Sequence, residues 1–151
     1  MGSGDLRKAL KATTNDRRKG HSLDIHLNDF NASVVARNVM LLSIISTPEF
    51  NPDDENDFAF LWDLWYNSEW PTTTRDRFNV VLKDLLDGKL SENIIIAKSK
   101  HLQILRETWS SWLTTSSKSL SASNLLMKQV GKERYGREFK INSININVKF
   151  I

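Results

Sequence analysis

A chain of 151 residues that is 40% hydrophobic and 26% charged has the composition of a soluble globular protein with a single core. It contains no cysteine, which excludes disulfide bonds and thiolate metal sites, and no apolar run reaches the roughly 18 residues that a membrane span needs. The net charge of +3 is mild, and the basic residues near the start are not interleaved with aromatic ones. We therefore expect neither a membrane nor nucleic acid as a partner.

The first part of the chain predicts a strand between two helices. Residues 22–27 alternate between apolar and polar side chains, and this period of two is typical of a strand. Apolar residues at helical spacing predict a short helix over residues 6–14 and a longer helix over residues 32–46. Either Asp29 or Asn31 would cap the longer helix.

The middle of the chain predicts two helices that face the core with large side chains. Acidic residues at 53–57 suit the start of the first helix, because they complement its dipole. It carries a face rich in aromatic side chains, made of Phe58, Leu61, Trp62, Leu64 and Trp65. The second helix begins at residues 71–74 and ends at Gly88, with a stripe made of Phe78, Val81, Leu82, Leu85 and Leu86.

The last part of the chain is less regular. The apolar run Ile94–Ile96 is too short to distinguish a strand from the start of a helix. The further expected elements are a helix over residues 101–113, a serine-rich loop over 116–123, a helix over 125–137 and a strand over 141–151. The chain is thus predicted to be helix-rich, with a few strands.

A glycine turn before the first helix, followed by an acid after the first strand, is the order in which nucleotide-binding domains hold a ribose-bearing cofactor. Gly2 and Gly4 would allow close backbone approach, while Asp5 favours a cationic cofactor such as S-adenosylmethionine over a pyrophosphate. Asn28 and Asp29 would then face the ribose hydroxyls. The alternative is that the glycines are a tag remnant or a flexible terminus and that Asp29 caps a helix.

No residue pattern predicts catalysis. The three histidines lack metal-ligand spacing with carboxylates, and no serine lies in a nucleophile-elbow pattern, so we predict neither a catalytic residue nor a metal site. Most of the five tryptophans are expected in the core. An interaction surface is expected from Trp65, Tyr66 and Trp70, and Trp70, which lies before Pro71, is the best candidate for exposure.

Four tracts together resemble one family: Gly4–Leu10, Leu27–Asn38, Leu64–Ser68 and Asp84–Leu90. They look like the DUF4470 domain, which occurs at the amino end of dynein axonemal assembly factor 3 and in many MYND-finger proteins. The resemblance extends to about residue 140, which predicts a domain over residues 1–140 and a strand-like segment over 141–151. It implies an α/β, helix-rich fold, with an incomplete Rossmann-like, methyltransferase-related start and a mostly helical continuation.

The strand that the family places before the glycine turn has no counterpart here, so we expect a domain that lacks its first strand. These residues contain no cysteine-rich finger, so the resemblance implies no zinc binding by them. The resemblance implies a non-catalytic, cytoplasmic protein-interaction domain, in a role such as the assembly of axonemal dynein. The alternative is a fragment of an S-adenosylmethionine-dependent methyltransferase. A third and weaker alternative is nucleic-acid binding through the basic segment near the start.

Overall fold

The computed structural model describes residues 6–8, 10–11, 23–67, 69–116 and 144–150. In chain order its elements are β1 (Leu23–Asp29), α2 (Ala32–Ile45), α3 (Glu55–Tyr66), α4 (Thr72–Leu86), β2 (Ile94–Ile96), α5 (Ser99–Ser116) and β3 (Ile144–Phe150). Residues 6–8, 10 and 11 are also helical, within the range predicted for a short helix. The chain is helix-rich with few strands, as expected.

The strands form one three-stranded sheet in the order β1–β3–β2. β3 pairs antiparallel with both neighbours: Leu27 lies opposite Ile146, and Ile146 lies opposite Ile96 on its other side. The predicted strand near the end of the chain is confirmed by β3, and the ambiguous run at 94–96 is a strand.

The Rossmann-like start is not confirmed, because such a start predicts parallel neighbours in the sheet. The pairings among the described strands are all antiparallel. The physical reason is that β3, which comes from the far end of the chain, takes the place beside β1. β1 and β2 consequently run in the same direction but are separated by β3.

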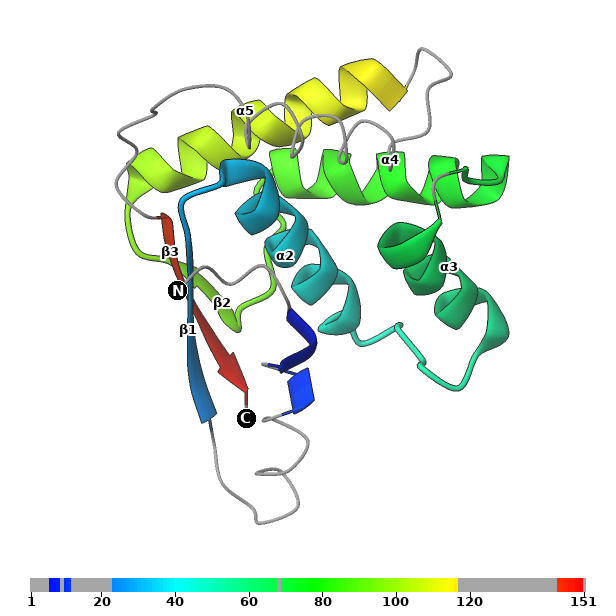
Figure 1. Ribbon diagram of the computed structural model, residues 1–151, viewed down its shortest axis with the longest axis horizontal. Helices are drawn as coiled ribbons and strands as arrows, with labels where there is room; N and C mark the ends of the chain where they lie inside the picture. The colour runs from blue at the N-terminus through cyan, green and yellow to red at the C-terminus, as the bar shows by residue number, and fades with distance from the viewer. Residues whose placement is uncertain (1–5, 9, 12–22, 68, 117–143, 151) are drawn as a thin grey trace.

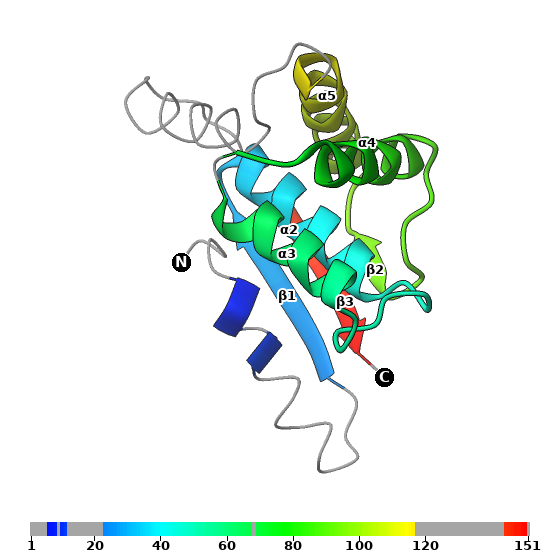
Figure 2. The same cartoon turned by 90° about the vertical axis from the view of Figure 1, so that its right-hand side faces the viewer.

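The helix α2 lies against the sheet, and α3 lies on the side of α2 that is remote from the sheet (Figure 1 and Figure 2). α4 and α5 pack side by side across one end of this arrangement, above α2 in Figure 1. The core is shared by all of these helices, with fully buried side chains that include Leu42 of α2, Phe78 of α4 and Trp109 of α5.

Local sequence signals set the helix ends. Asn31, one of the two predicted caps, accepts hydrogen bonds from the backbone N–H groups of Ser33 and Val34 at 2.9 and 3.2 Å. Asp54 does the same for α3. After α4, Gly88 has a φ of +85°, a left-handed conformation that glycine adopts without strain, and this ends the helix as predicted.

The described part of the chain contains no helix that is both long enough and apolar enough to cross a membrane. The loop predicted over residues 116–123 falls almost wholly outside the described residues, and so does the helix predicted over 125–137.

Candidate functional site

The predicted cofactor residues are only partly placed by the structure. Gly2, Gly4 and Asp5 lie outside the described residues. Asn28 is exposed and Asp29 is partly buried at the end of β1. The carboxylate of Asp29 accepts a hydrogen bond from the backbone N–H of Asn31 at 3.0 Å, immediately before α2. Asp29 thus has a visible structural role, which is to hold the turn that positions the cap of α2.

An exposed aromatic stripe runs along the outer face of α3. It consists of Phe58, Trp62 and Tyr66, whose side chains are 57%, 50% and 54% exposed. Their spacing of four residues places them on one helix face. The ring centroids of Phe58 and Trp62 are 6.1 Å apart, and those of Trp62 and Tyr66 are 4.6 Å apart, so the three rings form a continuous apolar surface.

This stripe corrects the sequence prediction for Trp62, since the tryptophans were mostly expected in the core. The face of α3 that is buried instead carries Phe60, Asp63 and Leu64. Large apolar side chains occur on both sides of this helix, so periodicity alone could not choose its inner face. Asp63 helps to define the inner face of α3, because its hydrogen bonds to the segment that follows hold this side of the helix toward the core.

Asp63 connects α3 to the segment that follows it. Its buried carboxylate accepts hydrogen bonds from the side-chain amide of Asn67 and, at 2.6 Å, from the hydroxyl of Thr74 in α4. Its backbone carbonyl accepts a further bond from the indole N–H of Trp70 at 2.8 Å. These bonds fix the rotation of α3 about its own axis, and the stripe faces solvent as a result.

The three predicted interaction residues occupy different environments. Tyr66 belongs to the exposed stripe, and its hydroxyl accepts a hydrogen bond from Arg7 at 3.2 Å. Trp65 is partly buried, with its ring centroid 6.5 Å from that of Tyr66. The exposure expected for Trp70 is wrong: it is 5% exposed and packs edge-on against Phe78. Its N–H finds backbone acceptors in the turn, so the ring can be buried at no hydrogen-bonding cost.

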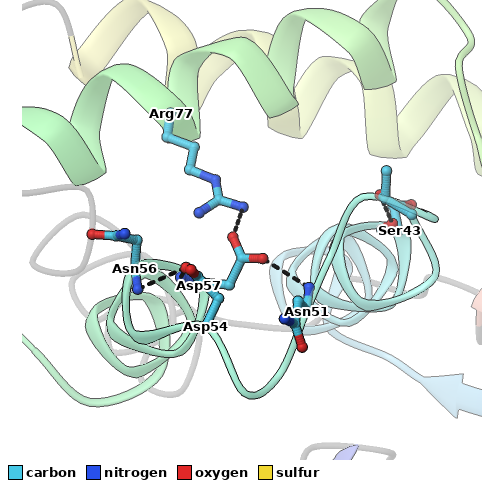
Figure 3. Close-up of polar contacts among 7 residues, drawn as sticks. Ser43, Asn51, Asp54, Asn56, Asp57 and Arg77 are labelled. Atoms are coloured by element: carbon cyan, nitrogen blue, oxygen red, sulfur yellow. Dashed lines mark hydrogen bonds and ion pairs between the residues drawn. The ribbon is translucent and has the colours of Figure 1, made fainter.

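The start of α3 is held to α4 by a charged cluster, which Figure 3 shows in close-up. The carboxylate of Asp57 accepts one hydrogen bond from the backbone N–H of Asn51 at 2.8 Å and one from the guanidinium of Arg77. That guanidinium also lies 4.3 Å from the ring centroid of Phe60. The bonds from Asn51 and then Arg77 hold the pKa of Asp57 below its usual value.

Replacing Asp57 with asparagine is expected to remove part of the dependence of stability on pH. A carboxyl whose pKa is lowered by folding stabilises the folded state above its unfolded pKa, about 3.9, and this contribution is lost as the pH falls through the folded pKa. In urea unfolding at several pH values, the free energy of unfolding of the wild type should be larger than that of D57N at neutral pH. This difference should disappear below about pH 4. The exposed neighbour variant D53N is the control, and parallel pH profiles for wild type and D57N would contradict the prediction.

The segment that contains α3 is rich in acidic residues. Residues 38–74 contain seven Asp and Glu residues and no Lys or Arg, although the whole chain has a net charge of +3. Asp53, Asp54 and Glu55 are all exposed at the start of α3, next to Phe58. The aromatic stripe therefore ends in a patch of negative charge.

A cavity of about 660 Å³ lies on the other side of α3. Residues 43–50 at the end of α2, residues 77–85 of α4 and residues 89–93 form its walls, and Phe60 contributes from α3. Its volume falls within the range of roughly 300–1,000 Å³ that is typical of small-molecule sites. Neither Asn28 nor Asp29 lines it, and sequence reasoning missed it because four separate segments build it.

The fold and the exposed face of α3 define a helix-rich α/β protein with an aromatic surface. Comparison with known families then places part of the chain: the model of a family described as "Domain of unknown function (DUF4470)" matches residues 1–70. The match confirms the DUF4470 resemblance for the segment that holds β1, α2 and α3. No curated protein and no solved structure matches the chain significantly.

Proposed function

We propose that this chain is a non-catalytic protein-interaction domain and that the aromatic stripe of α3 is its contact surface. The observation that carries the proposal is the exposure of Phe58, Trp62 and Tyr66, three large rings in contact with one another on one helix face. Exposed aromatic surface is unfavourable in water and is typical of interaction sites, where Trp and Tyr supply much of the binding energy.

The charge around the stripe favours a basic partner. Asp53, Asp54 and Glu55 flank its first ring, and the whole segment from residue 38 to residue 74 has no basic residue to neutralise them. A partner segment that presents apolar side chains together with Lys or Arg would match both the rings and the carboxylates. The same carboxylates would repel phosphates, which argues against nucleic acid as the ligand of this face.

The setting that the family resemblance implies is cytoplasmic assembly of protein complexes such as axonemal dynein. The alternative is a methyltransferase-like lineage with binding of S-adenosylmethionine, which is supported by the order β1, Asp29, α2. Calorimetric titration with S-adenosylmethionine separates the two proposals. Micromolar binding that is lost in Asp29→Ala would overturn the non-catalytic proposal.

Replacing Phe58, Trp62 and Tyr66 with serine together is expected to abolish partner binding and to leave the fold intact. Partners retained from extracts of source cells by the immobilised wild-type chain should be absent from the triple variant, because hot-spot aromatic residues each contribute about 2 kcal/mol or more. The wild-type interaction should also weaken as salt rises.

The matched control is Phe30→Ser combined with Ile95→Ser, since both side chains are more than half exposed and lie outside both the stripe and the cavity. This variant should retain the same partners as the wild type. Circular dichroism and the urea midpoint of the triple variant should stay close to the wild-type values, because its three side chains are already half exposed. Retention of the same partners by the triple variant would contradict the proposal.

A further inference from the structure

The cavity between α2, α4 and residues 89–93 has a largely apolar wall. Its apolar lining consists of Ile44, Phe50, Phe60, Val81, Leu85 and Leu90. Val80 of α4 adds an apolar side chain that is 56% exposed. A volume of about 660 Å³ is several times that of one side chain, so the cavity is large enough for a whole small molecule rather than a single anchoring residue.

Both basic side chains of the cavity are already neutralised. Arg77 is paired with Asp57, and the ammonium of Lys89 lies 2.7 Å from the carboxylate of Asp84. Asp84 also holds the pKa of Lys89 above its usual value, so this pair stays charged. An anionic ligand would have to displace one of these carboxylates, which makes the cavity a poor anion site.

The charge that is left over is negative. Glu49 and Glu92 line the cavity, and neither makes an ion pair or a side-chain hydrogen bond within the described ranges. The carboxyl end of α2 also borders it, through residues 43–47, and carries the negative end of the helix dipole with no basic residue in its last turn. The hydroxyl oxygen of Ser43, another lining residue, is buried and makes no hydrogen bond with any described residue.

We propose that this cavity binds a small organic cation, with an apolar body and one ammonium or guanidinium group. The apolar body would lie against Phe50, Val81 and Leu90, and the positive group would lie between Glu49 and Glu92 near the end of α2. The site lies on the opposite side of α3 from the aromatic stripe, so it is independent of the proposed interaction function.

The test is a titration of the full chain, followed by amide NMR shifts, with three probes of matched shape. Phenylbutylamine is cationic, phenylbutanol is neutral and phenylbutyrate is anionic. We expect the amine to bind at least about tenfold more tightly than the alcohol, which corresponds to about 1.4 kcal/mol, and the acid to bind more weakly than the alcohol. The shifts should gather in residues 43–50 and 89–93. Equal affinities for amine and alcohol, or no binding by any of the three, would overturn the proposal.

Two variants locate the site. The double variant E49Q/E92Q should reduce amine binding to the level of the alcohol and leave the alcohol unchanged, while D53N/E55Q, which changes two exposed acids outside the cavity, should bind like the wild type. V80W should narrow the cavity and weaken the binding of all three probes, whereas I95W, at a similarly exposed residue outside it, should not. Amine binding by V80W as tight as that of the wild type would overturn the assignment of the site.

A further arm distinguishes the source of the cation. If a capped peptide that contains phenylalanine next to lysine binds with the same dependence on Glu49 and Glu92, and phenylbutylamine does not bind, the small-ligand proposal is overturned in favour of a partner's side chain. The F58S/W62S/Y66S variant should bind the amine normally. Failure of the cavity proposal can therefore be recognised separately from failure of the stripe proposal.

Discussion

Replacing Trp109 with alanine is expected to destabilise the protein by about 3–5 kcal/mol, the range found for large aromatic residues removed from protein cores. Trp109 is fully buried in α5, and its indole N–H donates to the backbone carbonyl of Ala36 in α2 at 3.2 Å. The substitution would leave a cavity between the two helices and remove the hydrogen bond that joins them. Since typical domains are stable by about 5–15 kcal/mol, this variant should be close to unfolded at physiological temperature.

Urea unfolding followed by circular dichroism measures this effect without relying on tryptophan fluorescence. Trp109→Phe keeps an aromatic ring and should lose much less stability than Trp109→Ala, because the lost hydrogen bond contributes only about 1 kcal/mol net. Trp62→Ala is the control, since its ring is half exposed and the loss should stay below about 1 kcal/mol. Similar losses for Trp109→Ala and Trp62→Ala would show that the assigned burial is wrong.

Replacing Asp63 with alanine should have the second-largest effect, a loss of about 2–4 kcal/mol. The substitution removes a carboxylate that accepts bonds from Asn67 and Thr74, and it leaves the buried hydroxyl of Thr74 without that acceptor. It should also weaken partner binding through the aromatic stripe, because the same bonds set the rotation of α3. Asp63 would then be a positioning residue for the stripe without touching the partner.

The measurements are urea unfolding and partner retention for Asp63→Ala, Asp63→Asn and the exposed control Asp53→Ala. Asparagine keeps the shape and one acceptor oxygen, so its loss should be smaller than that of alanine. A double-mutant cycle with Thr74→Val should give a coupling energy of about 0.5–3 kcal/mol if the hydrogen bond seen at 2.6 Å is formed in solution. Additive losses in this cycle would contradict it.

Much of the fold could be predicted from local patterns. The alternation at residues 22–27 predicted β1, Asn31 was one of two candidate caps for α2, and Gly88 marked the end of α4. Phe78, Leu82 and Leu85 are buried as their helical spacing indicated. These signals are local, because each depends only on side chains within one or two turns of the chain.

The candidate sites were harder to predict because they depend on tertiary contacts. α3 carries large apolar side chains on both faces, and its inner face is set by contacts with α4. These contacts are the bond of Asp63 to Thr74 and the contacts of Arg77 with Asp57 and Phe60. The burial of Trp70 also depends on tertiary structure, since its indole N–H donates to two backbone carbonyls that no sequence pattern reveals. The cavity combines residues 43–50, 60, 77–85 and 89–93, so no single motif marks it.

The central place of β3 in the sheet has a consequence for how the chain folds. Asp29 of β1 lies opposite Ile144 of β3, a pair separated by more than a hundred residues, and β2 joins the sheet only through the same strand. The neighbouring helices α4 and α5 can form from short-range contacts. The sheet, in contrast, forms only when β1 and β3 come together from distant parts of the chain, and such long-range contacts form slowly in folding. During synthesis β1 and β2 are made well before β3. Until β3 is made, both strands lack their partner, and unpaired strand edges promote aggregation of nascent chains.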